Sequence, residues 1–160
     1  MRIGIGYDIH RFAEDRKLML GGIEIPYIKG LISYSDGDVV LHAISDAILG
    51  ALSLGDIGKH FANSDPQYKD MPSANILKKV ATMALSKNFT LSNVDATIIA
   101  EEPKICPFRD KMVESIAGIL GVSIDKVNVK ATTNEGVGSI GRGDAIAAYA
   151  VVMLEEKRQG

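Results

Sequence analysis

Apolar residues recur at every second position in several segments of the chain, and this spacing predicts β-strands. Residues Ile3–Ile9 alternate between large apolar side chains and glycine or polar residues, a period of two that is typical of a strand. The same alternation predicts strands at Val94–Ala100 and Val127–Thr132. Ala145–Leu154 is rich in small and branched residues and follows a glycine-rich loop, so we interpret it as a buried strand.

Other apolar residues lie three or four positions apart, and this spacing predicts three helices. The first lies between Asp38 and Gly55, and the second between Pro72 and Asn88. The third covers Met112–Leu120 and is followed by a glycine, a common residue just after a helix.

Leu18–Ile25 combines two short apolar runs with a Gly21-Gly22 turn, which predicts a small hairpin. Strands and helices follow one another without strict βαβ alternation. The predicted fold is therefore α+β, with a mixed four-stranded sheet, helices on one face and the hairpin added. We expect residues 1–160 to form a single domain, because this length is close to the common domain size.

The charge balance excludes several classes of partner. The 18 Lys and Arg residues oppose 20 Asp and Glu residues, so bulk charge does not favour binding to nucleic acid or to a membrane surface. The longest apolar run, Ala145–Leu154, is about half as long as a membrane span. Met1 leads directly into the first strand without a signal-peptide pattern, and the single Cys106 excludes an internal disulfide framework. We therefore expect a soluble cytoplasmic protein.

Three residues have the chemistry of metal ligands. Asp8 and His10 are two positions apart on a predicted strand, so their side chains project from the same face. His42 lies opposite the main apolar face of the first helix, and Asp46, one turn later, is placed to hold its imidazole. Two imidazoles and a carboxylate with an open fourth position are typical of catalytic zinc, although a solvated strand end is the alternative interpretation. His60 has no comparable partner, and we interpret it as a surface or packing residue.

Gly136–Gly141 carries the letters of a dinucleotide-binding fingerprint, but no helix pattern follows it and too few residues remain for a second strand. We interpret it as a flexible loop whose amides, with Arg142, approach an anion. The alternative is a tight turn between two strands. Thr132, Thr133 and Glu135 precede this loop, and Glu135 could hold magnesium on a phosphate.

Ala100–Pro107 leaves a predicted strand as a loop stiffened by two prolines. Its backbone groups could contact the edge of a base, with Lys104 on a phosphate. The alternative is an ordinary connection from a strand to a helix. Cys106 has no histidine near it in the sequence, so we do not expect it to act as a nucleophile.

Six blocks of sequence together carry a family resemblance. They are Arg2–His10, Ser35–Val39, Leu41–Ala43, Leu54–Lys59, Val127–Thr133 and Gly141–Gly143. With them the chain resembles the 2-C-methyl-D-erythritol 2,4-cyclodiphosphate synthases of the non-mevalonate isoprenoid pathway, from residue 2 to about residue 150.

The resemblance implies a ferredoxin-like or chorismate-mutase-like chain, assembled as a homotrimer with an active site at each subunit interface. The enzyme would be a phosphorus–oxygen lyase that converts 4-diphosphocytidyl-2-C-methyl-D-erythritol 2-phosphate to 2-C-methyl-D-erythritol 2,4-cyclodiphosphate and CMP. Asp8, His10 and His42 match the ligands of one Zn²⁺ per subunit. Glu135 matches the ligand of a Mg²⁺ or Mn²⁺ on the substrate diphosphate.

The resemblance also implies which residues bind the substrate. On the erythritol and phosphate side they are Asp56, Ile57, Gly58, Phe61, Ala62, Asn63, Ser64 and Asp65. On the cytidine side, contributed by a neighbouring subunit, they are Ala100, Glu101, Glu102, Pro103, Lys104, Ile105, Cys106, Ala131, Thr132 and Thr133. Asp8, Ile9, His10, Tyr34, Ser35, Asn134, Glu135, Ser139 and Arg142 complete the expected set.

Tyr34 and Thr133 are the expected catalytic residues, through hydrogen bonds to the reacting phosphates, with Ser35 assisting. The 2-phosphate of the substrate is itself the nucleophile, so the protein needs to supply alignment and charge dispersal rather than a nucleophilic side chain. Position 34 departs from the family, which usually has histidine before Ser-Asp-Gly-Asp. A tyrosine hydroxyl still donates a hydrogen bond but adds no positive charge near neutral pH.

Two other functions use the same residue types. A trimeric cytidine-nucleotide binding module would need the phosphate loop but not two metal ions. A zinc phosphohydrolase would incorporate water and release a linear product.

A plastid-type compartment replaces the cytoplasm as the expected location if a transit peptide has been removed.

Overall fold

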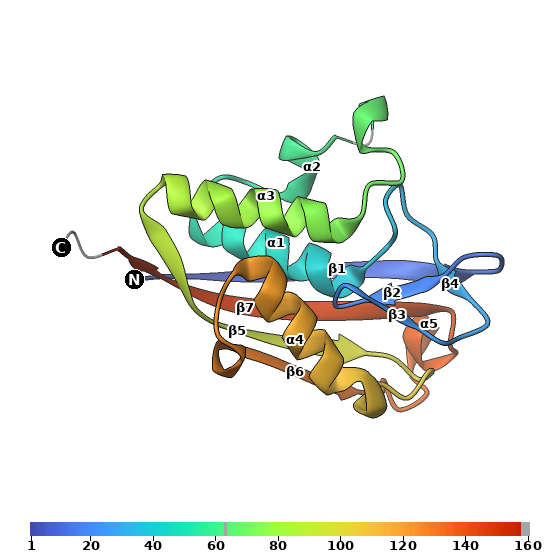
Figure 1. The fold of residues 1–160 in the computed structure, drawn as a ribbon. Helices are drawn as coiled ribbons and strands as arrows, with labels where there is room; N and C mark the ends of the chain where they lie inside the picture. The colour runs from blue at the N-terminus through green and yellow to red at the C-terminus, as the bar shows by residue number, and fades with distance from the viewer. Residues whose placement is uncertain (63, 158–160) are drawn as a thin grey trace.

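The computed structural model describes residues 1–62 and 64–157, which form a five-stranded sheet, a hairpin and a layer of helices (Figure 1). The sheet consists of β1 (Arg2–Ala13), β4 (Gly30–Leu31), β5 (Phe89–Ile99), β6 (Val127–Thr132) and β7 (Ala145–Glu156), and the hairpin of β2 (Leu18–Leu20) and β3 (Ile23–Ile25). The helices are α1 (Val39–Ala51), α2 (Ile57–His60), α3 (Ser73–Ser86), α4 (Arg109–Leu120) and α5 (Gly138–Gly141), with 3₁₀ turns at Pro66–Tyr68, Cys106–Phe108 and Ile124–Lys126. None of the helices in the described part of the chain is both long enough and apolar enough to cross a membrane.

The strands follow the order β4–β1–β7–β5–β6, with β5 and β6 parallel and the other neighbours antiparallel. The α+β class, the mixed sheet and the hairpin are therefore confirmed. The sheet has one strand more than expected, because β4 pairs with Phe12 and Ala13 at the end of β1. A strand of two residues has no alternation that a sequence pattern could detect. β5 also begins earlier than expected, because an irregularity between Leu91 and Asn93 interrupts the alternation there.

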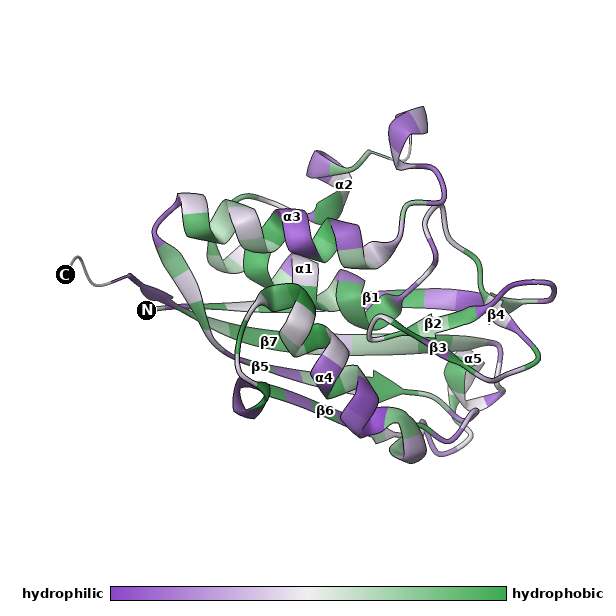
Figure 2. Cartoon of the chain, in the orientation of Figure 1, coloured by the Kyte–Doolittle hydropathy of each residue, from purple (hydrophilic) through white to green (hydrophobic). Residues whose placement is uncertain are grey.

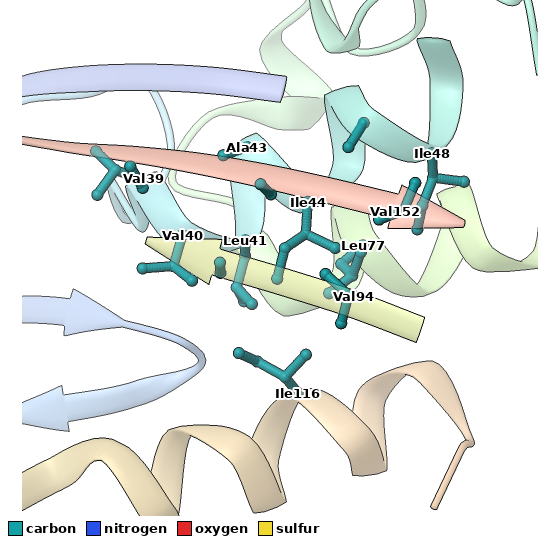
Figure 3. Close-up of a cluster of buried hydrophobic side chains, with 14 of the residues drawn as sticks. Val39, Val40, Leu41, Ala43, Ile44, Ile48, Leu77, Val94, Ile116 and Val152 are labelled. Atoms are coloured by element: carbon teal, nitrogen blue, oxygen red, sulfur yellow. The ribbon is translucent and has the colours of Figure 1, made fainter. Parts of the chain in front are cut away.

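The three long helices all lie on one face of the sheet, as predicted (Figure 1). Helix α1 packs on β1 and β7, α3 packs on α1, and α4 packs on β6. Side chains such as Ile44, Leu77, Ile116 and Val152 meet between these layers and form the core (Figure 3). Strand β7 is hydrophobic over most of its length (Figure 2), as expected for a strand between two others under a helix layer.

Helix α1 is enclosed between the sheet and α3. Every one of its residues except Asp46 and Gly50 is buried. The side of the helix that carries His42 and Ser45 is therefore buried as well. The physical reason is that α3 covers this side of the helix, an arrangement that the sequence pattern of α1 alone does not indicate.

Strand β1 approaches α1 more closely than side chains would allow. A Cβ atom at Gly6 would lie 1.9 Å from the carbonyl oxygen of Ala43, and one at Gly4 would lie 1.9 Å from the carbonyl oxygen of Ala47. The glycines therefore let the helix backbone rest on the strand. On the opposite side of β1, Ile5 is exposed to 67%.

Asp38 ties the start of α1 to the turn of the hairpin. Its carboxylate accepts hydrogen bonds from the backbone N–H groups of Val40 and Leu41, which caps the helix. It also accepts from Gly21 and Gly22 at 3.0 and 2.7 Å. Both glycines have positive φ, as the tight turn between β2 and β3 requires.

The glycine-rich segment after β6 contains one turn of helix, α5, rather than only an open loop. Gly136 and Gly138 have positive φ, which lets the chain fold back on itself. A Cβ atom at Gly141 would lie 2.1 Å from the carbonyl carbon of Gly136. Close backbone packing within the segment, which composition does not indicate, accounts for the difference.

We expect Gly6→Ala to lower the free energy of unfolding by about 1–3 kcal/mol, because the added methyl group pushes α1 away from β1. Gly118→Ala is the matched control, since nothing lies within 4 Å of its added Cβ in helix α4. That control should raise stability by about 0.5–1 kcal/mol. Urea unfolding followed by circular dichroism measures both, and equal stability changes in the two variants would contradict the close-contact argument.

Candidate metal centre and substrate pocket

Asp8, His10 and His42, here called the ligand triad, come together as predicted. The His42 Nδ1 atom lies 2.8 Å from the Asp8 Oδ2 atom, and the His10 Nε2 atom lies 3.0 Å from the same oxygen. The two histidine nitrogens are 3.4 Å apart. One ligand atom from each residue lies within 4.8 Å of the others.

The local folding of two elements places the triad. Asp8 and His10 follow Gly4 and Gly6 at the same two-residue spacing, so all four positions face the helix layer. His42 lies in the first turn of α1, where the contact with Gly6 brings the helix down onto the strand. The triad is thus assembled across the β1–α1 contact.

Burial and mutual charge act in opposite directions on the triad. Burial alone would raise the pKa of the Asp8 carboxyl, but the hydrogen bonds and charges of His10 and His42 outweigh it and hold this pKa well below its ordinary value. Burial alone would lower the pKa of His42, yet the hydrogen bond and charge of Asp8 outweigh it and raise this pKa. The site therefore favours an ionised carboxylate and attracts positive charge.

The donor set fits a divalent transition metal. Two imidazole nitrogens and one carboxylate oxygen on a partly open site leave room for a further ligand, as in catalytic zinc centres. His60, in contrast, lies outside this cluster, and its Nε2 atom is 3.0 Å from the carbonyl oxygen of Leu54. Its role as a surface or packing residue stays a prediction.

Asp46 does not hold the His42 imidazole, so that expectation is wrong. Its carboxylate accepts a hydrogen bond of 2.7 Å from the backbone N–H of Ile57, and burial raises its pKa. The Nε2 atom of His42 instead contacts Ser73 Oγ at 2.8 Å and Ser35 Oγ at 3.1 Å. Spacing along α1 could not reveal Ser73, because this residue belongs to α3.

A cavity of about 200 Å³ opens beside the triad. Seven of the expected substrate-binding residues lie on its wall. Two of them, Asp8 and His10, belong to the triad, and the other five are Tyr34, Ser35, Ile57, Gly58 and Phe61. The cavity is lined by Asp8, His10, Ser33, Tyr34, Ser35, His42, Ile57, Gly58, Phe61, Tyr68 and Ile76. Ser33, Tyr68 and Ile76 were not expected, because none of them carries a motif.

Of the remaining residues expected on the erythritol and phosphate side, Asp56 and Asp65 lie next to this wall. Asp65 accepts a hydrogen bond through its carbonyl oxygen from the Tyr34 hydroxyl, at 3.3 Å. Asp56 caps α2 by accepting from the backbone N–H of Lys59. Ala62 and Ser64 flank Asn63, which lies outside the described residues.

The residues expected on the cytidine side lie at the other edge of the sheet. Asp8 is in register with Ala148, which pairs with Ile98, which in turn pairs with Ala131. Three strand spacings separate Asp8 from Ala131, roughly 14 Å. Within one chain the two expected halves of the site therefore do not meet.

This second group is organised by Glu101. Its side chain accepts hydrogen bonds from the backbone N–H groups of Asn134 at 2.8 Å and Gly136 at 3.3 Å. The hydroxyl of Thr133 donates to Glu135 Oε1 at 3.0 Å. Beside this loop, a cavity of about 230 Å³ is lined by Ile105, Cys106, Arg109, Lys130 and Ala131.

Ser139 and Arg142 line a third cavity, of about 680 Å³, together with Ile9 and Arg11. Ile9 alternates with Asp8 and points to the face of β1 opposite the triad. Neither Ser139 nor Arg142 lines the cavity beside the triad. Their assignment to the substrate stays a prediction.

Comparison with known proteins identifies a matching family and relatives that are similar over nearly the whole chain. The YgbB family model matches residues 1–155. The 2-C-methyl-D-erythritol 2,4-cyclodiphosphate synthase of Geobacter sulfurreducens is 57% identical over 157 residues, covering 98% of this chain and 100% of the relative. The synthase of Alkaliphilus metalliredigens is 55% identical over 154 residues, covering 96% of this chain and 97% of the relative.

Solved structures share the fold closely. The bifunctional IspDF of Campylobacter jejuni has a TM-score of 0.93 and 39% identity, with 97% of this chain and 42% of that longer chain covered. A CDP complex of IspF from Plasmodium falciparum has a TM-score of 0.86 and 37% identity, with 98% of this chain and 97% of that chain covered.

We expect His42→Ala to weaken zinc binding by more than the roughly 100-fold that accompanies loss of an outer hydrogen bond, because one of three protein ligands is removed. His60→Ala is the matched control, since it deletes an imidazole outside the triad. Competition of the metal-free proteins with a chromophoric chelator measures the affinities. Equal zinc affinity in the two variants would rule out the triad as the metal site.

Proposed function

The chain belongs to the YgbB family, and we propose that its ligand triad and the adjoining cavity form the metal-binding half of the active site. The enzyme converts 4-diphosphocytidyl-2-C-methyl-D-erythritol 2-phosphate to 2-C-methyl-D-erythritol 2,4-cyclodiphosphate and CMP, a phosphorus–oxygen lyase reaction of the non-mevalonate pathway. The observation that carries the site assignment is the convergence of three metal-ligand side chains on the wall of a pocket.

The triad would hold one Zn²⁺ per subunit through Asp8, His10 and His42. Glu135 would hold a Mg²⁺ or Mn²⁺ on the substrate diphosphate, since carboxylate oxygens suit these hard cations. When bound, such ions supply Lewis-acid stabilisation of charge on phosphate oxygens.

The reaction needs no protein nucleophile. An oxygen of the substrate 2-phosphate bonds to the β-phosphorus, while the bond from that phosphorus to the bridging oxygen breaks and CMP leaves with the electron pair. The pocket residues therefore have to align these groups and exclude water. The half-buried Tyr34, the buried Ser35 and the backbone of Ile57 and Gly58 are the groups that surround the reacting phosphates in this proposal.

Tyr34 has a second role in this pocket. Its hydroxyl donates to the carbonyl oxygen of Asp65, and its own carbonyl oxygen accepts from the backbone N–H of Asp70. It therefore ties the segment after α2 to the loop before α1. Because the hydroxyl has a single proton, it would have to leave the carbonyl oxygen of Asp65 in order to donate to a phosphate oxygen when substrate binds.

The cytidine half of the site would come from a neighbouring chain in a chorismate-mutase-like homotrimer. Ala100–Cys106 and Ala131–Thr133 would bind the nucleotide there, with Thr133 donating to a phosphate. The separation of these segments from the triad within one chain supports this arrangement. So does the uncovered face of the sheet.

Across β1 and β7 that face is apolar, and this part of it is here called the apolar face. Its residues pair across β1 and β7, with Ile5 opposite Val151 and Tyr7 opposite Tyr149, whose rings lie 4.6 Å apart. Their exposed fractions range from 43% to 67%. A contiguous apolar surface of this kind marks a protein–protein interface, and a cyclic trimer would bury it symmetrically.

We expect incubation with the diphosphocytidyl substrate to yield the cyclic diphosphate and CMP in equal amounts. Phosphorus NMR distinguishes this product from the linear phosphate that a phosphohydrolase would release. Running the reaction in ¹⁸O-labelled water adds a second criterion, because cyclisation incorporates no solvent oxygen. A linear, labelled product would overturn the assignment.

Tyr34→Phe should lower turnover about tenfold, because one hydrogen bond to the negative charge that develops on the phosphates is lost, while bound cations still stabilise that charge. Tyr68→Phe is the control, since Tyr68 lines the same cavity but has no assigned role in the reaction. Steady-state release of CMP measures both. Unchanged turnover and substrate affinity in Tyr34→Phe would reduce residue 34 to a packing role.

Light scattering should give a mass of about three times 17.2 kDa. Ile5→Asp should dissociate this assembly and abolish turnover, because it places a charge on the apolar face. Ile124→Asp is the matched control, since Ile124 is similarly exposed, to 62%, but lies in a 3₁₀ turn away from β1. A parent protein that is an active monomer would contradict the shared site.

A further inference from the structure

His42 is held from both sides, and only one side belongs to the ligand triad. Its Nδ1 atom faces Asp8 and His10, whereas its Nε2 atom faces the Oγ atom of Ser73 at 2.8 Å. Ser73 is the first residue of α3 and is fully buried, and His42 is exposed to only 4%. Their contact is therefore shielded from water.

Ser73 is in turn bound to a carboxylate. Its hydroxyl donates to Asp36 Oδ1, and its backbone N–H donates to Asp36 Oδ2 at 3.0 Å. Asp36 Oδ1 also accepts from the backbone N–H of Asp38 at 3.2 Å. Because an ionised carboxylate only accepts, the single proton of the Ser73 hydroxyl is committed to Asp36.

This commitment determines which nitrogen of His42 carries the proton. With its own proton directed at Asp36, the Ser73 oxygen can only accept a hydrogen bond from the His42 ring. Nε2 must therefore carry a proton, because an unprotonated Nε2 would oppose two lone pairs at 2.8 Å. A cation held by the triad would take the place of the proton that Nδ1 shares with Asp8 at 2.8 Å, so the lone pair of the neutral ring would then be on Nδ1, facing the triad.

We propose that Ser73, oriented by Asp36, is a positioning residue that fixes the His42 tautomer and ring orientation with the Nδ1 lone pair directed at the metal site. The inference extends the proposed metal centre and rests on it. Ser35 is a weaker second acceptor, because its Oγ lies farther from Nε2, at 3.1 Å, and already accepts from the backbone N–H of Gly37.

The first test measures metal affinity rather than turnover. Ser73→Ala should weaken zinc binding to the metal-free protein by about 10–100-fold, the usual effect of removing a hydrogen-bond partner of a ligating histidine. Competition with a chromophoric chelator gives the affinity. Replacing zinc by cobalt gives a visible absorption spectrum, whose ligand-field bands should shift in the variant.

Ser45→Ala is the matched control. Ser45 is also a fully buried serine, and it lies on the same helix as His42, but its hydroxyl donates to the carbonyl oxygen of Leu41 and not to the ring. Ser45→Ala loses one buried hydrogen bond and Ser73→Ala loses two, so a purely structural effect would lower stability in both. Only Ser73→Ala should change zinc affinity and the cobalt spectrum.

The second test observes the hydrogen bond itself. In long-range ¹H–¹⁵N correlation spectra of the zinc-loaded proteins, the His42 Nε2 proton should resonate farther downfield in the parent than in Ser73→Ala, because only the parent has the Ser73 acceptor. Parent-like zinc affinity together with a parent-like Nε2 proton resonance in Ser73→Ala would overturn the inference alone. A parent that binds no zinc would overturn the metal centre and the inference with it.

Discussion

Helix α1 rests with its backbone directly against strand β1, and every group of the metal centre depends on this contact. A Cβ atom at Gly6 would lie 1.9 Å from the Ala43 carbonyl oxygen, so any residue other than glycine at this position would push the helix away from the strand. His42 immediately precedes Ala43, so the contact between Ala43 and Gly6 also sets the position of His42. Two positions farther along β1, Asp8 completes the pair at 2.8 Å.

The same contact divides the sheet into two chemically different faces. Glycines and ligands face the helices, and the alternation of the strand then forces Ile3, Ile5 and Tyr7 to the other side. The helix layer covers the first face, whereas the second is uncovered and is apolar across β1 and β7. The element that builds the metal centre thus also creates the surface through which the proposed trimer would form.

The chemistry of the reaction explains why the pocket contains so few reactive side chains. Because the substrate carries its own nucleophilic phosphate, the protein has to supply alignment of the reacting groups and positive charge. In the proposed mechanism a cation held by the triad would supply the positive charge, and the half-buried Asp36 and the buried Ser73 support the geometry of the triad. Tyr34, with the segment that its hydrogen bond to Asp65 holds in place, would supply the alignment.

The sequence alone determined the class of the fold and the identity of the triad, because periodicity is local and the spacing of Asp8 and His10 sets their common face. The motifs shared with a known enzyme family then indicated the reaction as well. Other features depended on segments that meet only after folding. Ser73 replaces Asp46 beside His42 because α3, starting 31 residues later, covers that side of α1. The burial of α1 and the short strand β4 likewise arise from packing between elements, which no single stretch of sequence encodes.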